Sequence, residues 1–169
     1  RGCSRQSGGD VGITSAPGQG TVVRLILPQA SPARALLPAG TRVLLVEDAA
    51  ADAAHLRRLL PGASLVETSD PEAALRLIAG PQPFDLVITD LHLGADPAGW
   101  RIAEAALSHS PATLALVVSG RLPASDPLTS RFPGRAYCLP KPVDAAALAA
   151  CLQGIPADDT ASRRADLRL

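Results

Sequence analysis

Aromatic side chains are scarce, at 2% of the 169 residues. They comprise Phe84, Trp100, Phe132 and Tyr137. A surface that binds nucleic acid by stacking bases on aromatic rings therefore has little material here. Net charge offers no substitute, because 16 basic residues balance 16 acidic ones and no global field attracts DNA or anionic lipid. We expect no nucleic-acid partner.

Methionine is absent, even at position 1, which indicates a processed product or a piece of a longer protein. Cys3, Cys138 and Cys151 lie far apart and lack the spacing of a metal site. An odd number of cysteines without evident pairing is typical of a reducing compartment, so we expect a cytoplasmic protein. No apolar run is as long as a membrane span and no signal peptide is visible, so we expect no membrane contact by this chain.

Four zones differ in composition. Residues 1–28 contain Gly-rich stretches and alternating apolar segments, whereas residues 29–40 carry two prolines and no stable period, as a linker does. Residues 41–153 alternate apolar runs with Ala/Leu-rich stretches. Residues 154–169 are polar and are predicted to form a frayed tail. The whole chain of 169 residues is long enough for one full domain with appendages.

Within residues 41–153, five apolar runs alternate with helical patterns. The runs are RVLLV (42–46), ASLVE (63–67), FDLVIT (84–89), TLALVVS (113–119) and residues 135–139. The helical patterns bury Leu56, Leu59 and Leu60; Ala74, Leu75 and Ile78; Ile102, Ala103, Ala106 and Leu107; and Leu148, Cys151 and Leu152. This alternation predicts an α/β fold with a doubly wound, five-stranded parallel sheet.

Local signals predict two helix starts and one interrupted helix. Asp70 and Pro71 supply an N-cap and a first-turn proline, and Asp144 supplies a second N-cap. Pro123 and Pro127 interrupt any helix in the stretch between the last two runs.

Polar residues occupy the ends of four of the runs. Glu47 and Asp48 follow the first, Asp90 follows the third, Ser119 ends the fourth and Lys141 follows the fifth. With strand order 2-1-3-4-5 these four strands are successive neighbours, so their carboxyl ends share one crevice. Three carboxylates placed so close repel one another, and a hard divalent cation removes that conflict. Mg²⁺ suits the set, because it binds a few carboxylate oxygens and keeps several waters for an incoming phosphate.

The same groups fit phosphoryl transfer, in which catalysis is largely positioning and charge neutralisation. Asp90 is the candidate nucleophile. Lys141 and Ser119 are candidates for bonding phosphoryl oxygens.

The segments VLLVED, FDLVITDL, LVVSG and CLPKP, in this order and spacing, resemble the response-regulator receiver family. The resemblance implies a flavodoxin-like strand order, 2-1-3-4-5. It also implies that Asp90 is the phosphorylated aspartate and that Glu47 and Asp48 are the acidic pair that binds Mg²⁺. The main-chain carbonyl of His92 would complete the metal ligands supplied by the protein.

The resemblance extends to the groups around the phosphate. Ser119 resembles the switch hydroxyl, with Gly120 beside it leaving space for the phosphoryl group. Lys141 resembles the family's lysine, and its bond to Pro142 is expected to be cis.

Several positions depart from the family pattern. Cys138 occupies the place of the usual switch aromatic, Tyr137 is one position away, and serine replaces the commoner threonine at 119. The loop LHLGADPAGW is slightly longer than usual, and the fourth helix is broken by proline. These changes leave the phosphorylation chemistry in place but question the usual route from phosphate to output surface. An alternative function is therefore a pseudo-receiver, a protein-interaction module that regulates a kinase without phosphorylation.

Two other functions of doubly wound folds fit less well. An aspartate-based phosphatase would need a second catalytic Asp shortly after Asp90, where His92 stands. A flavin site would need hydroxyls and glycine after the first strand, where there are carboxylates.

The segment SGGDVGITSAPGQGTVVRLILP, in residues 1–28, resembles the end of a histidine-kinase ATPase domain, with two strands around a Gly-rich turn. The plainer alternative is a hairpin whose GQG turn needs residues tolerant of positive φ. Followed by a linker and a receiver, the first interpretation implies a hybrid histidine kinase. The chain itself would be a phosphoacceptor and not a kinase, because the ATP-binding parts are missing. The implied partners are a histidine kinase core, in cis or in trans, and a histidine phosphotransfer protein; a homodimer is left open.

Overall fold

The computed structural model describes residues 10–16, 20–26, 36–94, 96–121 and 126–153. The chain divides into two compact units, Arg1–Arg34 and Ala35–Leu169. The tail predicted for residues 154–169 and most of the predicted linker lie outside the described residues. No helix in the described ranges is long and apolar enough to span a membrane.

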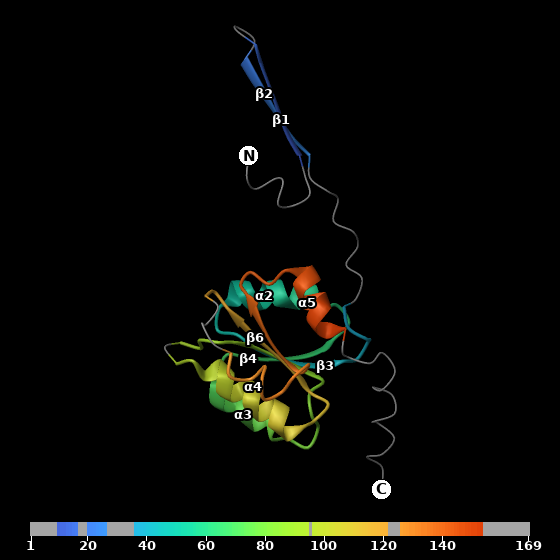
Figure 1. Cartoon of the computed structure of the whole chain (residues 1–169), viewed down its shortest axis with the longest axis vertical. Coiled ribbons are helices and arrows are strands. Elements are labelled where there is room, and N and C mark those ends of the chain that lie inside the picture. Colours follow the sequence, from blue (N-terminus) through green and yellow to red (C-terminus); the bar gives the residue numbers. More distant parts are fainter. Residues whose placement is uncertain (1–9, 17–19, 27–35, 95, 122–125, 154–169) are drawn as a thin grey trace. The chain divides into compact units, whose positions relative to one another are not determined.

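The first unit contains a two-stranded antiparallel sheet (Figure 1). Strand β1 (Asp10–Ala16) pairs with β2 (Gly20–Ile26) in a register that runs from Asp10 opposite Ile26 to Ala16 opposite Gly20. Gly20 has a φ of 80°, a conformation that glycine adopts without a steric penalty. The expected N-terminal hairpin-like appendage is confirmed.

The second unit is built on a five-stranded parallel sheet. Its strands are β3 (Arg42–Val46), β4 (Ser64–Thr68), β5 (Leu86–Asp90), β6 (Leu114–Ser119) and β7 (Ala136–Pro140). Their spatial order is β4-β3-β5-β6-β7, which is order 2-1-3-4-5 when the strands of this unit are counted along the chain. The α/β fold class and the strand order predicted from the sequence are confirmed.

Helices cover both faces of this sheet (Figure 1). They are α2 (Ala50–Leu59), α3 (Pro71–Ile78), α4 (Ala98–His109) and α5 (Ala145–Leu152). Leu56 of α2 and Leu148 of α5 join one core cluster, whereas Ile78 of α3 and Ile102 of α4 join a cluster on the other face. The predicted caps form: the Asp70 carboxylate accepts the N–H of Glu72, and Asp144 caps α5.

The described residues between β6 and β7, which include Pro127, contain no regular helix, as expected. Residues 126–135 form turns, in which the Asp126 carboxylate accepts the N–H groups of Leu128 and Thr129. Leu128 is 2% exposed and fills a third core cluster against α4. The guanidinium of Arg135 then donates to three carbonyl oxygens at the C-terminal end of α4 and just beyond it. These belong to Leu107, Ser110 and Thr113.

The chain enters this unit through residues 36–40, the described end of the predicted linker. Leu37 is 3% exposed and belongs to the core cluster shared by α2 and α5. The Thr41 hydroxyl donates to the Pro38 carbonyl at 2.7 Å, and the Gly40 N–H donates to the Gly62 carbonyl at 3.1 Å. These residues therefore pack as part of the second unit.

Candidate functional site

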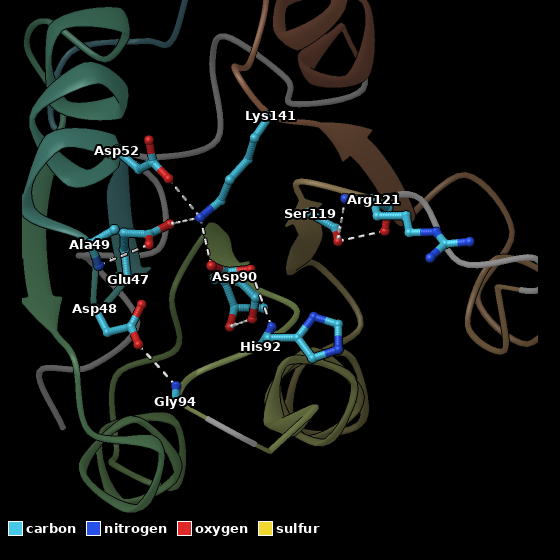
Figure 2. Close-up of polar contacts among 11 residues, drawn as sticks. Glu47, Asp48, Ala49, Asp52, Asp90, His92, Gly94, Ser119, Arg121 and Lys141 are labelled. Carbon is cyan, nitrogen blue, oxygen red and sulfur yellow. Dashed lines mark hydrogen bonds and ion pairs between the residues drawn. The ribbon is translucent and has the colours of Figure 1, made fainter.

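Three carboxylates meet at the carboxyl end of the sheet (Figure 2). Glu47 follows β3 directly; its side chain is fully buried and accepts the N–H of Ala49 at 3.1 Å. Asp48 is exposed and accepts the N–H of Gly94 at 2.9 Å. Asp90 is the last residue of β5 and accepts the N–H of His92 at 3.2 Å. The predicted convergence of these groups is present.

The acidic cluster has the composition and spacing of a cation site. Glu47, Asp48 and Asp90 each offer one oxygen, and these oxygens lie within 4.8 Å of one another. Glu47 Oε2 is buried and accepts no hydrogen bond within the described part of the chain, which is costly for a carboxylate oxygen. A hard cation bound by these oxygens would relieve the repulsion among the three carboxylates and give Glu47 Oε2 a ligand bond. The residues present therefore fit a divalent metal ion.

Lys141, just after β7, aims its ammonium into the cluster. Its Nζ donates to Asp90 Oδ2 at 2.5 Å and to Asp52 Oδ2 at 2.9 Å. The same nitrogen lies 2.7 Å from Glu47 Oε2, an ion pair without hydrogen-bond geometry. The bond between Lys141 and Pro142 is cis, as expected.

Burial and charge oppose each other at this site. Burial raises the pKa of Glu47 above its ordinary value, and the close contact with the Lys141 ammonium offsets only part of that rise. Burial alone would lower the pKa of Lys141, but its contacts with the carboxylates of Asp90, Glu47 and Asp52 outweigh burial and leave the pKa raised. Lys141 is therefore a fixed positive charge at physiological pH.

The remaining predicted site residues lie less directly on the cluster. The Ser119 hydroxyl donates to the Arg121 carbonyl at 2.7 Å, and Figure 2 shows no hydrogen bond between Ser119 and Asp90. Ser119 nevertheless ends β6, the neighbour of β5, so it lies at the same edge of the sheet. The His92 imidazole points away from the carboxylates (Figure 2), as expected for a residue that would act through its main chain. The ligand role of its carbonyl stays a prediction.

Asp52 is the one group in direct contact with Lys141 that the sequence analysis missed. It lies in the first turn of α2, and its side chain is 40% exposed. A signal was present, since an acidic residue one turn into the helix after β3 can face the same edge as Asp48.

Gly99 allows α4 to approach the end of β5 closely. Its N–H donates to the Leu91 carbonyl at 3.1 Å. A Cβ placed on Gly99 would lie 2.2 Å from the Asp90 carbonyl oxygen and 2.7 Å from Leu91 Cα. Only a residue without a side chain allows this close approach.

Tyr137 and Cys138 point to opposite sides of β7. Tyr137 packs against the cluster of α2 and α5, and its hydroxyl donates to the Gly134 carbonyl at 2.9 Å. Cys138 packs against the third cluster, as do Trp100 and Phe132. Because neighbouring residues of a strand face opposite ways, Tyr137 cannot occupy the place of Cys138 without a register shift.

The comparison with solved structures agrees with this architecture, whereas two comparisons of the sequence found no match. No family model matches the sequence, and no curated protein matches it. Among solved structures, a receiver domain from Methylobacillus flagellatus is 24% identical, with a TM-score of 0.57 over 70% of this chain and 100% of that one. The second unit has the response-regulator receiver fold.

Two further solved structures share this fold. One is a response regulator protein from Burkholderia pseudomallei, 25% identical, with a TM-score of 0.52 over 76% of this chain and 73% of that one. That structure holds a phosphorylated aspartic acid, a calcium ion and citrate. A receiver protein from Sinorhizobium medicae is 21% identical, with a TM-score of 0.54 over 69% of this chain and 94% of that one.

Proposed function

We propose that this receiver domain accepts a phosphoryl group on Asp90 from a phosphohistidine, in a reaction that depends on Mg²⁺. The observation that carries the proposal is the position of the Asp90 carboxylate. It lies in the acidic cluster and accepts a hydrogen bond from Lys141 Nζ at 2.5 Å. An acceptor oxygen, a fixed cation and a set of metal ligands are thereby brought to one point.

The transfer requires only positioning and charge neutralisation from the protein. An Asp90 carboxylate oxygen forms the new O–P bond. The N–P bond of the donor breaks, its electron pair stays on the imidazole nitrogen, and that nitrogen takes a proton from water. Lys141 would bind a phosphoryl oxygen with an N–H group that binds a carboxylate in the unphosphorylated domain. Ser119 would bind a second phosphoryl oxygen by rotating its hydroxyl away from the Arg121 carbonyl.

Glu47, Asp48 and Asp90 would hold the metal, with the His92 carbonyl as a further ligand. When bound, Mg²⁺ supplies neutralisation of the charge on the phosphoryl oxygens. We propose Mg²⁺ because the ligand set is small and leaves coordination positions for water and phosphate.

Phosphoryl acceptance can be tested with acetyl phosphate and Mg²⁺ followed by intact-mass measurement. We expect the mass of one phosphoryl group on the unaltered chain and none on Asp90→Asn, because the amide is not a nucleophile. Asp96→Asn is the matched control, since it removes an exposed carboxylate from the adjacent loop and should leave labelling unchanged. Equal labelling of Asp90→Asn and the unaltered chain would reject Asp90 as the acceptor.

Mg²⁺ should also stabilise the folded domain, because the acidic cluster exists only when the strand ends are assembled. At concentrations well above the dissociation constant, the gain should be about 1–3 kcal/mol in the free energy of unfolding. Asp48→Ala should remove most of it, as measured by thermal melts with and without Mg²⁺. A thermal midpoint that ignores Mg²⁺ in the unaltered chain would instead favour a pseudo-receiver.

We further propose that the chain comes from a cytoplasmic hybrid histidine kinase. The antiparallel pair β1–β2, followed by a receiver domain, supports this proposal, because it has the order expected of the end of an ATPase domain, a linker and a receiver. The donor would be a histidine kinase core and the acceptor downstream a histidine phosphotransfer protein.

The alternative proposal, a pseudo-receiver that binds a kinase without phosphorylation, is favoured by two observations. The Ser119 hydroxyl is engaged by its own loop, and Cys138 stands in the place of the switch aromatic. The acetyl phosphate experiment distinguishes the two functions.

A further inference from the structure

Asp52 lies outside the acidic cluster yet shares its only ammonium. The cluster consists of Glu47, Asp48 and Asp90, and Asp52 contacts it through Lys141 alone among the contacts described. Its side chain is 40% exposed, compared with 0% for Glu47 and 13% for Asp90. Of the three carboxylates around Lys141, Asp52 is therefore the one that water can solvate most readily when the contact breaks.

Three carboxylate oxygens surround the ammonium of Lys141, as many as it has N–H groups. It carries three N–H groups, of which two donate to Asp90 and Asp52. Glu47 Oε2, 2.7 Å away, is the third carboxylate oxygen around it. A phosphoryl oxygen can bind Lys141 only if one of these contacts is given up.

Helix α2 holds Asp52 in this position through a second contact. His55, one turn further along α2, places its Nε2 2.8 Å from the carbonyl oxygen of Val143. The segment that carries Lys141 is thus joined to α2 at two points, by a side-chain pair and by a side-chain–backbone contact. These two contacts hold the segment that carries Lys141 beside the part of α2 that carries Asp52.

We infer that Asp52 is a positioning residue that competes with the phosphoryl group for Lys141 and thereby limits how tightly the site binds it. The inference rests on the proposed function. Because Asp90 and Glu47 are also needed at the metal, Asp52 is the acceptor that a phosphoryl oxygen would replace. Its negative charge opposes the same anion, so both effects weaken phosphoryl binding.

The test is a titration with beryllofluoride, a phosphoryl mimic, at saturating Mg²⁺. Binding is monitored through the fluorescence of Trp100, the single tryptophan. Exposed ion pairs contribute little, so Asp52→Ala should tighten binding by about three- to fivefold. Asp52→Asn, which keeps an acceptor oxygen without the charge, should give a smaller gain. Asp52→Glu should restore the affinity of the unaltered chain.

The matched control is Glu104→Gln on α4, which removes a carboxylate whose described ion pair is with Arg131, at 2.6 Å, and not with Lys141. It should leave the affinity unchanged, whereas a loss of net charge alone would tighten binding equally in both variants. Unchanged or weaker binding by Asp52→Ala, with normal binding by the unaltered chain, overturns the inference and leaves the proposed function standing. Failure of the unaltered chain to bind the mimic overturns both.

Discussion

Gly99→Ala should lose about 3 kcal/mol or more in its free energy of unfolding and fail to accept a phosphoryl group. Alanine is the better helix former, by about 1 kcal/mol in a helix interior, so propensity alone would predict a gain. The steric term is larger, because the new Cβ would lie 2.2 Å from the Asp90 carbonyl oxygen and 2.9 Å from the Asp90 carbonyl carbon. Both contact partners are backbone and cannot rotate away. Either α4 or the end of β5 has to move, and Asp90 moves with it.

The measurements are denaturant unfolding and labelling by acetyl phosphate. Gly120→Ala is the matched control for stability, because a Cβ on Gly120 meets no atom within 4 Å. That variant should stay within about 0.5 kcal/mol of the unaltered chain. Two variants of equal stability would show that the close approach at Gly99 is easily relieved.

Lys141→Met should destabilise the metal-free domain by about 3 kcal/mol near neutral pH, because it leaves buried carboxylates without their counter-ion. The Glu47 side chain is fully buried, and that of Asp90 is 13% exposed. Phosphoryl acceptance should also be lost, since no other ammonium reaches the Asp90 carboxylate within the described residues.

The loss of stability in Lys141→Met should depend on pH. Burial raises the pKa of Glu47 in the folded state, and the close contact with the charge of Lys141 lowers it. Without Lys141 the pKa of Glu47 in the folded state rises further. Protonation of Glu47 then stabilises the folded state at low pH, and this stabilisation is lost as the pH rises through the raised pKa. The deficit should therefore shrink as the pH falls from 7 towards about 5.

Arg101→Met is the matched control for Lys141→Met. It breaks an ion pair of similar length, 2.6 Å to Glu72, whose side chains are 56% and 61% exposed. Its effect should stay within about 0.5 kcal/mol and show no comparable pH dependence. Equal losses in the two variants would contradict the assignment of a special role to Lys141.

The fold was predictable because its signals are local. RVLLV coincides with β3, Asp70 and Asp144 cap the helices they precede, and residues 126–135, the described residues just before β7, form turns as their prolines predict. Strand ends were less predictable: Asp90 belongs to β5 itself, whereas Phe84, expected in the strand, is buried before it.

The site was predictable where it follows from strand order, and two of its contacts, those of Asp52 and Gly99, were not predicted because they join distant segments. The convergence of Glu47, Asp48, Asp90 and Lys141 follows from strand order, which alternation along the chain reveals. The position of Asp52 in the first turn of α2 was a signal in the sequence, but its contact with Lys141 also depends on where the distant segment after β7 lies. The approach of Gly99 to Asp90 likewise depends on the packing of α4 on the sheet.

Leu37 determines where this domain can be joined to other modules. Because its side chain fills the core between α2 and α5, a fusion spliced at Thr41 would remove a buried leucine and leave a cavity. Loss of such a side chain costs about 2–5 kcal/mol. A chimeric sensor that borrows this domain should therefore retain the chain from Leu36 onward, so that exchange of the upstream module leaves the transplanted core complete.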